Sequence, residues 1–500
     1  MRSLSDIAPM CSSGDPYPRD DVPITSSPTP PITDEEKPLP ITLQKMTYTI
    51  LSDDQVNSIL EGLTVDELEE FRHVLASSLH EFSTGVPALE AAYQQPNRIS
   101  TTHPETQAKT LYMPSCAPCG MGCKVISLTT AEASQEADSK PITPTGVVNL
   151  FRPDGSPLGI VHASALTAFR TALASTCLLA RRSHVKTLTV FGSGLQAYWH
   201  IRLALMMRGH TIKHVHIINR RWSKNATSLL KKFASISPEI KEREGWTDVK
   251  FGLLIPAFHE YNRLLKEQMR DADVIYCCTS SQEDLFDASI LTSHEGRKKG
   301  RLIIAVGSYT PEMRELPDDL LQLAVKQYDK PHRHYHKHAP EGGVIVVDNI
   351  KGVLKEAGEI VAAKIGPHQL VELGELVMLH RQAIEESDDP ISSQTSLASD
   401  DKFDHGRSSI STVFGSDAPS SPSSVSSDPR KSGSIFHFRK GSNSSLDNEK
   451  GKKEDHLVRW LRDGTVIYKS VGLGLMDLVV GMHLVEVANE KHIGTRIEGF

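Results

Sequence analysis

The sequence is poor in aromatic residues and cysteines and has no long hydrophobic run. Aromatic side chains make up 6% of it, and its seven cysteines are an odd number, which argues against the disulfide framework of a small secreted protein. The most apolar stretch, residues 471–487, is interrupted by Asp477, His483 and Glu486, so we expect no transmembrane helix. The first residues lack the apolar core of a signal peptide, and we therefore expect a cytoplasmic protein.

The chain also lacks an excess of positive charge. It has 55 Lys and Arg against 62 Asp and Glu, a formal net charge of −7. Such a chain has no overall basic field to attract nucleic acid or an anionic membrane, so neither is expected as a partner. A length of 500 residues allows about two to four domains.

Two segments have too few apolar residues to form a core. Nine prolines lie within residues 1–40, and 20 of the 60 residues from 387 to 446 are serine. Burial in such segments cannot offset the entropy lost on ordering. We therefore expect a disordered head over residues 1–45 and a disordered insertion over residues 387–455.

Between these segments the hydrophobic pattern predicts helices first and then alternating strands and helices. Apolar residues at helical spacing predict a helix from Leu51 to His80, and Pro153-Asp154-Gly155 between two apolar runs predicts a hairpin. After a helix over 163–180, apolar strands alternate with amphipathic helices, which indicates an α/β protein with a parallel sheet covered on both faces. The predicted strands are His184–Phe191, His214–Asn219, Val274–Cys278, Leu302–Val306 and Val344–Asp348, with helices Ala197–Arg208 and Asn225–Ser235 between them.

A glycine-rich motif follows the first of these strands and opens a helix. Residues 192–197 read Gly-Ser-Gly-Leu-Gln-Ala, which fits the G-x-G-x-x-A fingerprint of a Rossmann dinucleotide site. The glycines permit a tight turn and close approach of backbone N–H groups to a pyrophosphate at the helix N-terminus. The residues predicted to surround the pyrophosphate are Gly192, Gly194, Leu195 and Gln196.

The end of the second strand indicates which dinucleotide binds. An NAD site has an acidic residue there for the ribose 2′-hydroxyl, but no Asp or Glu occurs between Tyr198 and Pro238. The strand ends instead at Asn219, Arg220 and Arg221, and guanidinium groups are suited to a 2′-phosphate. We expect NADP(H) as the preferred cofactor, with NAD(H) possible.

Several motifs follow one another along the chain in a fixed order. They are Met113-Pro114, Gly122-Cys-Lys124-Val-Ile-Ser, Leu166-Thr-Ala-Phe-Arg170-Thr-Ala, the glycine motif, Asp271-Ala-Asp-Val-Ile, Ala305-Val-Gly-Ser-Tyr-Thr-Pro-Glu-Met-Arg-Glu-Leu, Val347-Asp-Asn, Glu356-Ala-Gly-Glu and Tyr468-Lys-Ser-Val-Gly-Leu. In this order they resemble the ornithine cyclodeaminase/mu-crystallin family over about residues 49–497, the serine-rich insertion excluded. The proline-rich head and the insertion resemble fungal members, some of them associated with proline utilisation.

The resemblance implies a two-domain subunit that forms a homodimer. A Rossmann-type, doubly wound NAD(P) domain would span residues 181–347. An α+β domain for substrate and dimerisation would be built from both chain ends, over residues 46–180, 348–386 and 456–500. The chemistry implied is NAD(P)-dependent oxidation or reduction at the carbon of a small amino or imino acid.

The carboxylate of such a substrate needs fixed cations around it. Three positions resemble the family's substrate-binding residues, and they are Arg98, Lys124 and Arg170. Lys124 resembles the active-site lysine, which can orient the carboxylate or relay a proton, and Arg170 lies among apolar residues, where a charge needs a partner. Thr279, Val306 and Ser470 are further positions expected to bind the cofactor.

One position departs from the family pattern. Where ornithine-cyclising members carry an aspartate, this chain has Tyr309. A phenol with a pKa of about 10 is not an ionised base at neutral pH without a large shift. We therefore expect reduction of a cyclic ketimine carboxylate of the pyrroline or piperideine type, with Lys124 or Tyr309 lending the proton. Ornithine cyclodeamination and a non-catalytic, ligand-binding role remain as alternatives.

Two further constellations could bind metal. Cys116, Cys119 and Cys123 have a spacing that resembles a zinc site, but a closed zinc site needs four ligands and no fourth is adjacent. Alternating histidines at 332–338 would share one face of an extended chain. We interpret the histidines as a solvated loop and expect no metal.

Overall fold

The computed structural model describes residues 47–85, 91–106, 108–129, 145–326, 343–377 and 457–500. The predicted head, the insertion and the alternating histidines lie outside these residues. Among the described helices, none combines the length and the apolar character that crossing a membrane requires.

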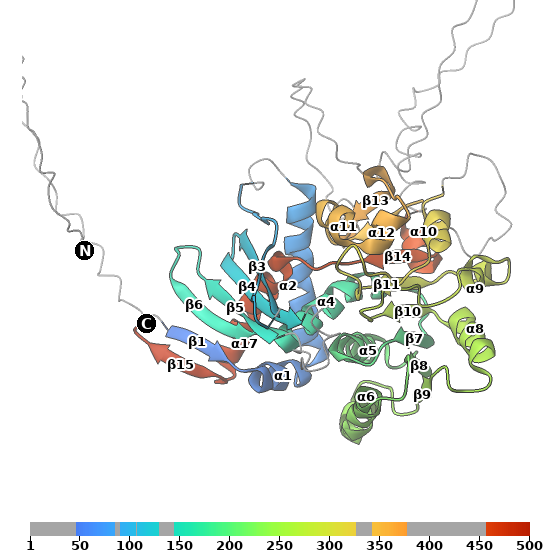
Figure 1. Ribbon diagram of the computed structural model, residues 1–500. Helices are drawn as coiled ribbons and strands as arrows, with labels where there is room; N and C mark the ends of the chain where they lie inside the picture. Colours follow the sequence, from blue (N-terminus) through green and yellow to red (C-terminus); the bar gives the residue numbers. More distant parts are fainter. Residues whose placement is uncertain (1–46, 86–90, 107, 130–144, 327–342, 378–456) are drawn as a thin grey trace, which may run out of the picture. The chain divides into compact units, whose positions relative to one another are not determined.

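The first of two sheets is built from both ends of the described chain. It has seven strands in the order β15-β1-β6-β5-β4-β3-β2. Its first and last strands in the sequence, β1 and β15, pair antiparallel and lie side by side in Figure 1. The strands are β1 Thr47–Leu51, β2 Ile99–Thr102, β3 Ala108–Ala117, β4 Gly120–Thr129, β5 Thr145–Phe151, β6 Pro157–His162 and β15 Thr495–Glu498.

Four helices pack in this part of the chain. They are α1 Asp53–Glu61, α2 Val65–Thr84, α4 Ala163–Leu179 and α17 Gly474–Glu490. The helix predicted from Leu51 to His80 is two helices, because Thr64 caps the start of α2 in a capping box with Glu67, a device that begins a new helix. Alternation of buried and half-buried residues along β3 shows that only one face of the sheet meets the helices.

The second sheet is the parallel sheet predicted from the sequence. Its order is β13-β12-β14-β11-β10-β7-β8-β9, and every pair is parallel. Its strands are β7 Thr187–Phe191, β8 His214–Ile218, β9 Lys250–Leu254, β10 Val274–Cys277, β11 Leu302–Ala305, β12 Ile345–Val347, β13 Leu370–Glu372 and β14 Val466–Lys469. From β7 the chain continues through β8 to β9 on one side of the sheet, and then returns to β10 on the other side of β7. The strand order therefore reverses between β7 and β10. Doubly wound sheets bind dinucleotides at such a reversal.

Helices connect these strands. They are α5 Leu195–Arg208, α6 Lys224–Ser235, α7 Pro238–Arg243, α8 Tyr261–Asp271, α9 Ser289–Thr292, α10 Asp318–Ala324, α11 Ile350–Glu356, α12 Gly358–Ala362 and α13 Leu373–Val377, with 3₁₀ turns η2 Gly296–Lys298 and η3 Pro367–Gln369. One apolar cluster joins a face of this sheet to the helices of the first sheet, and a second covers the opposite face. Burial on both faces explains why β10, β11 and β12, which are buried at every position, are almost entirely apolar.

The second sheet extends further along the chain than the predicted nucleotide-binding segment, residues 181–347. Strands β13 and β14 belong to it, although both fall within segments predicted for the other domain. They are three and four residues long, and neither was predicted as a strand. The domain boundaries themselves stay a prediction.

Candidate active site

The glycine motif forms the turn between β7 and α5. Gly192 has φ +106°, and a Cβ there would lie 2.7 Å from the carbonyl oxygen of Cys278, just after β10. No side chain caps the start of α5 at Gly194, so its first N–H groups have no side-chain acceptor at the cap. The local geometry therefore explains Gly192, leaves the space beside Gly194 open, and suits an anion at the helix N-terminus.

A cavity of about 680 Å³ is lined by six of the ten predicted cofactor positions, Gly192 not among them, and by all the predicted substrate and catalytic positions. The glycine motif contributes Gly194, Leu195 and Gln196, and the ends of β10, β11 and β14 are followed at the wall by Thr279, Val306 and Ser470. Across from these elements, in the first sheet and its helices, the wall includes Lys124 on β4 and Arg170 on α4. Arg98 and Tyr309 complete the predicted residues that line it.

Lys124 and Arg170 share a buried carboxylate. Lys124 Nζ lies 3.2 Å and 3.3 Å from the two oxygens of Asp477 on α17, and Arg170 Nε donates to Asp477 Oδ1 at 3.1 Å. The lysine and arginine are each 3% exposed and Asp477 is fully buried. With all three groups ionised the cluster carries one net positive charge at the cavity wall, which suits a single carboxylate ligand.

Asp477 was not predicted as a site residue. Its sequence signal is a single acid in an apolar helix, where a charge requires a buried partner, but nothing local indicates which partner. It is the anion that Arg170 was expected to need.

The environment of Lys124 shifts the pKa of its amine toward neutral pH. Burial, with a smaller effect of the nearby Arg170 charge, lowers the pKa of Lys124 to about 8 against the opposing effect of Asp477. Desolvation penalises the charged form of an amine. The group can therefore both hold and release a proton near neutral pH.

Arg98 lies at the edge of the cavity rather than in the buried cluster. Its guanidinium pairs with Glu356 at 2.5 Å and donates to the carbonyl oxygens of Val471 and Gly472 at 3.4 Å and 3.5 Å. Arg98 also lines an adjoining hollow of about 450 Å³. Arg98 therefore lies between the two spaces, and its ion-pair partner is Glu356.

A buried aspartate holds the loop that follows β14. Asp348 Oδ2 accepts hydrogen bonds from Ser470 Oγ, Val471 N and Gly472 N at 2.7 Å, 3.0 Å and 2.7 Å. Gly472 has φ +88°, and a Cβ there would lie 2.8 Å from a guanidinium nitrogen of Arg170. Only glycine fits between this loop and Arg170 without displacement.

Tyr309 faces the same cavity from the loop after β11. Burial raises the pKa of Tyr309 above its ordinary value, with Arg98 acting in the opposite direction. The phenol therefore stays protonated at neutral pH, where it can donate a hydrogen bond but cannot act as an ionised base.

Asn219, Arg220 and Arg221 lie outside the cavity, at the end of β8. Asn219 Nδ2 donates to the Arg221 carbonyl oxygen at 2.7 Å, and Ser193 Oγ donates to Asn219 Oδ1 at 3.5 Å, which joins this turn to the glycine motif. Both arginines are exposed, and neither pairs with a carboxylate in the described part of the chain.

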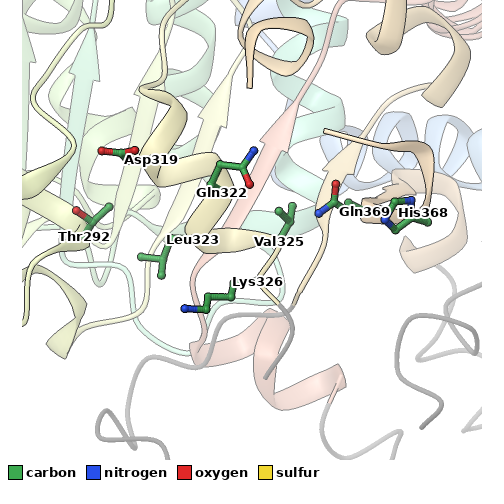
Figure 2. Close-up of a pocket in the computed structure, with 8 residues that line it drawn as sticks. All are labelled: Thr292, Asp319, Gln322, Leu323, Val325, Lys326, His368 and Gln369. Carbon is green, nitrogen blue, oxygen red and sulfur yellow. The ribbon is translucent and has the colours of Figure 1, made fainter. Parts of the chain in front are cut away.

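The remaining constellations do not contribute to the cavity. Cys116, Cys119 and Cys123 are free thiols on the β3–β4 hairpin, and the described residues contain no group of three potential metal ligands. Burial raises the pKa of Cys277 well above its usual range. This thiol is therefore an unreactive side chain packed in the core. A separate open hollow of about 700 Å³ lies beside α10, lined by the residues in Figure 2, and shares none of them with the cavity.

Comparison with known proteins agrees with this arrangement. The sequence profile of the ornithine cyclodeaminase/mu-crystallin family matches residues 55–369. The chain belongs to this family. Membership identifies it as an enzyme.

Individual relatives are distant. An uncharacterized protein of Saccharomyces cerevisiae is 27% identical over 66% of this chain and 86% of its own length. A Delta(1)-pyrroline-2-carboxylate reductase of Bacillus cereus is 28% identical over 59% of this chain and 78% of its own. Among solved structures, the Delta(1)-pyrroline-2-carboxylate reductase of Thermococcus litoralis, in complex with NADH and L-proline, has a TM-score of 0.53 at 18% identity and covers 90% of this chain and 100% of its own. This last likeness supports the shared two-part α/β fold.

Proposed function

We propose that the protein reduces a small cyclic ketimine carboxylate with NADPH. The observation that carries the proposal is the Lys124–Asp477–Arg170 cluster on the wall of the cavity that the glycine motif also lines. Reduction of a carboxylate-bearing imine requires cations that bind the carboxylate and a dinucleotide site in the same cavity. The cluster and the glycine motif would supply both. The family also includes a Bacillus cereus enzyme named for reduction of pyrroline-2-carboxylate, a compound of this class.

The cluster would hold the substrate's carboxylate. Asp477 neutralises one of two buried cations, so one positive charge is left for the ligand. Arg98 would add a second contact if it exchanged Glu356 for the substrate. Fixing the carboxylate fixes the imine carbon relative to the strand ends opposite, and such positioning makes the transfer effectively unimolecular.

The cofactor would lie along the ends of the parallel strands. Residues 192–196 would hold its pyrophosphate, and Thr279, Val306 and Ser470 would surround its nicotinamide. When bound, the nicotinamide supplies the hydride that the imine carbon gains. Arg220 and Arg221, exposed beside Asn219, would pair with a 2′-phosphate, which favours NADPH over NADH.

The imine nitrogen gains the proton in this reaction. Lys124 would donate this proton. Its pKa of about 8 means that the ammonium is protonated at neutral pH and is also acidic enough to release the proton. Tyr309 also lines the cavity and is a second donor. Ornithine cyclodeamination is less well supported, because Tyr309 stands where the cyclising members carry a carboxylate.

The outer face of the seven-stranded sheet supports a homodimer. Tyr112, Val125, Val147 and Ile160 lie on this face and are only half-buried. Several partly exposed apolar residues on one sheet face are typical of an interface with a second copy. Light scattering should give twice the chain mass of 55.1 kDa, and a monomer would contradict this part of the proposal.

The experiment follows NADPH absorbance with pyrroline-2-carboxylate and piperideine-2-carboxylate, beside NAD⁺ with ornithine. We expect NADPH consumption with a cyclic ketimine and no ammonia release from ornithine. Ammonia release from ornithine, with every cyclic ketimine unreacted, would replace the proposal with cyclodeamination.

A further inference from the structure

A buried charge network joins the ends of three strands below the cavity. Lys469 ends β14, Ser308 and Glu315 follow β11, and Glu359 lies on α12, which follows β12. All four residues are fully buried. The residues next to them in the chain, Tyr309 and Ser470, line the cavity, so the network lies one residue away from the site.

Half of this network is a neutral ion pair. Lys469 Nζ lies 2.9 Å from Glu359 Oε1 and donates to both the carbonyl and the hydroxyl of Ser308 at 2.6 Å. The Ser308 hydroxyl in turn donates to Glu359. The lysine thus has two hydrogen-bond acceptors and an ion pair with a Glu359 oxygen that accepts no hydrogen bond, and the pair leaves no net charge.

Glu315 is different, because its carboxylate is held by hydrogen bonds rather than by an ion pair. Its Oε1 accepts from Thr279 N at 2.7 Å and Thr279 Oγ1 at 3.0 Å, and its Oε2 accepts from Gly307 N at 2.7 Å and Ser308 N at 3.3 Å. Among the ion pairs of the described residues, none includes Glu315. The carboxylate joins the ends of β10 and β11 through hydrogen bonds alone.

These contacts require the ionised form of Glu315. Three of its four partners are backbone N–H groups, which can only donate, so a protonated carboxyl would lose an acceptor position. Burial raises the pKa of Glu315, while the charge of Lys469 and the hydrogen bonds from Thr279 and Gly307 oppose that effect. The result is a carboxylate in a region of low dielectric constant, where a charge acts strongly on its surroundings.

The position of Glu315 determines what its charge can act on. In a doubly wound sheet the second half of a dinucleotide lies over the strands beyond the order reversal, which here are β10, β11 and β14. Thr279 and Gly307, the direct partners of Glu315, line the cavity at those strand ends. Because the nicotinamide ring is cationic when oxidised and neutral when reduced, a negative charge below it favours the oxidised form.

We propose that Glu315 is a positioning residue whose fixed negative charge biases the bound cofactor toward hydride donation. It holds the Thr279 and Gly307 loops in place and stabilises the cationic ring that forms as the hydride leaves. This inference rests on the proposed NADPH-dependent function. A purely structural Glu315 would support both cofactor forms equally, whereas the proposed charge distinguishes them.

The test measures binding rather than turnover. Dissociation constants for NADP⁺ and NADPH are determined by calorimetry for the full chain and for Glu315→Gln, which keeps the shape and removes the charge. We expect NADP⁺ affinity to fall about fivefold more than NADPH affinity, a difference of about 1 kcal/mol. Thr279→Val is the matched control, since it removes one hydrogen bond to Glu315 but leaves the charge, and it should change both affinities alike.

A second pair of variants keeps the proposal testable if Glu315→Gln does not fold. Ser280 is exposed and lines the cavity beside Thr279, so Ser280→Asp and Ser280→Asn differ by one charge on the same wall. Ser280→Asp should favour NADP⁺ over NADPH relative to Ser280→Asn. Equal ratios within either pair would overturn the inference, and a full chain that binds neither cofactor form would overturn the proposed function itself.

Discussion

The carboxylate of Asp477 lies 3.2 Å from the ammonium of Lys124, although 353 residues separate them in the sequence. Asp477 is on α17, near the end of the chain, and Lys124 is on β4 of the first sheet. The contact forms only because α17 packs against the inner face of that sheet. Fold and site are therefore coupled at this pair, and changing it should affect both.

Removing the charge of Asp477 should destabilise the protein. Asp477→Asn leaves Lys124 and Arg170 buried without a carboxylate, and breaking a buried pair in this way costs about 3–5 kcal/mol. Urea unfolding followed by circular dichroism measures the loss. Glu267→Gln, which removes one of the two exposed partners of Arg263, is the control and should cost less than about 1 kcal/mol. Equal small losses in both variants would contradict the buried arrangement.

The reaction should lose rate as pH rises through the pKa of Lys124. That pKa is lowered to about 8, so the ammonium that supplies the proton is present below about pH 8 and absent above it. We expect kcat/KM for ketimine reduction to fall about tenfold per pH unit above this value. In Lys124→Met the alkaline limb should disappear along with most of the activity. A profile that stays level to about pH 10 would exclude Lys124 as the donor.

The cofactor preference should depend on the turn after β8. We expect NADPH to bind at least tenfold more tightly than NADH, about 1.4 kcal/mol, because Arg220 and Arg221 are exposed and have no carboxylate partner in the described structure. Arg220→Asp should invert the preference, since it places an acid where NAD sites have one. Equal affinity of the unmutated protein for both cofactors would contradict the assignment.

Gly472→Ala should impair the substrate site more than the fold. A Cβ at this position would lie 2.8 Å from the Arg170 guanidinium and would push it away from the ligand. Gly155 has nearly the same φ as Gly472, +86° against +88°, but a Cβ added there would have no atom within 4 Å. Gly155→Ala therefore introduces the backbone strain without a steric clash. Both variants should lose about 1 kcal/mol of stability, and only Gly472→Ala should raise KM for the imine. A similar KM in both would show that the contact with Arg170 does not matter.

The sequence predicted those features that depend on neighbours along the chain. The glycine motif after β7, and β10 and β11 with their apolar runs, were recognised because their signals are local. The α/β class followed from the same alternation of strands and helices.

Other features depend on contacts between distant segments and could not be predicted. Strand β13 is three residues long, and its place in the sheet is decided by pairing with β12. Lys124 pairs with Asp477, and Arg98 pairs with Glu356. The partners are far apart in the sequence, and no regular spacing along the chain indicates which residues pair. Single charges within apolar segments marked such groups as needing partners, but only the fold identifies the partners.

The most direct test of the account is a single-turnover assay of the purified protein with NADPH and a cyclic ketimine carboxylate, compared with Lys124→Met and Arg170→Met. The account predicts NADPH oxidation that yields the cyclic amino acid, lost in both variants while NADPH still binds and the circular dichroism spectrum is unchanged. Full activity in either variant, or no activity of the unmutated protein on any cyclic ketimine, would contradict it.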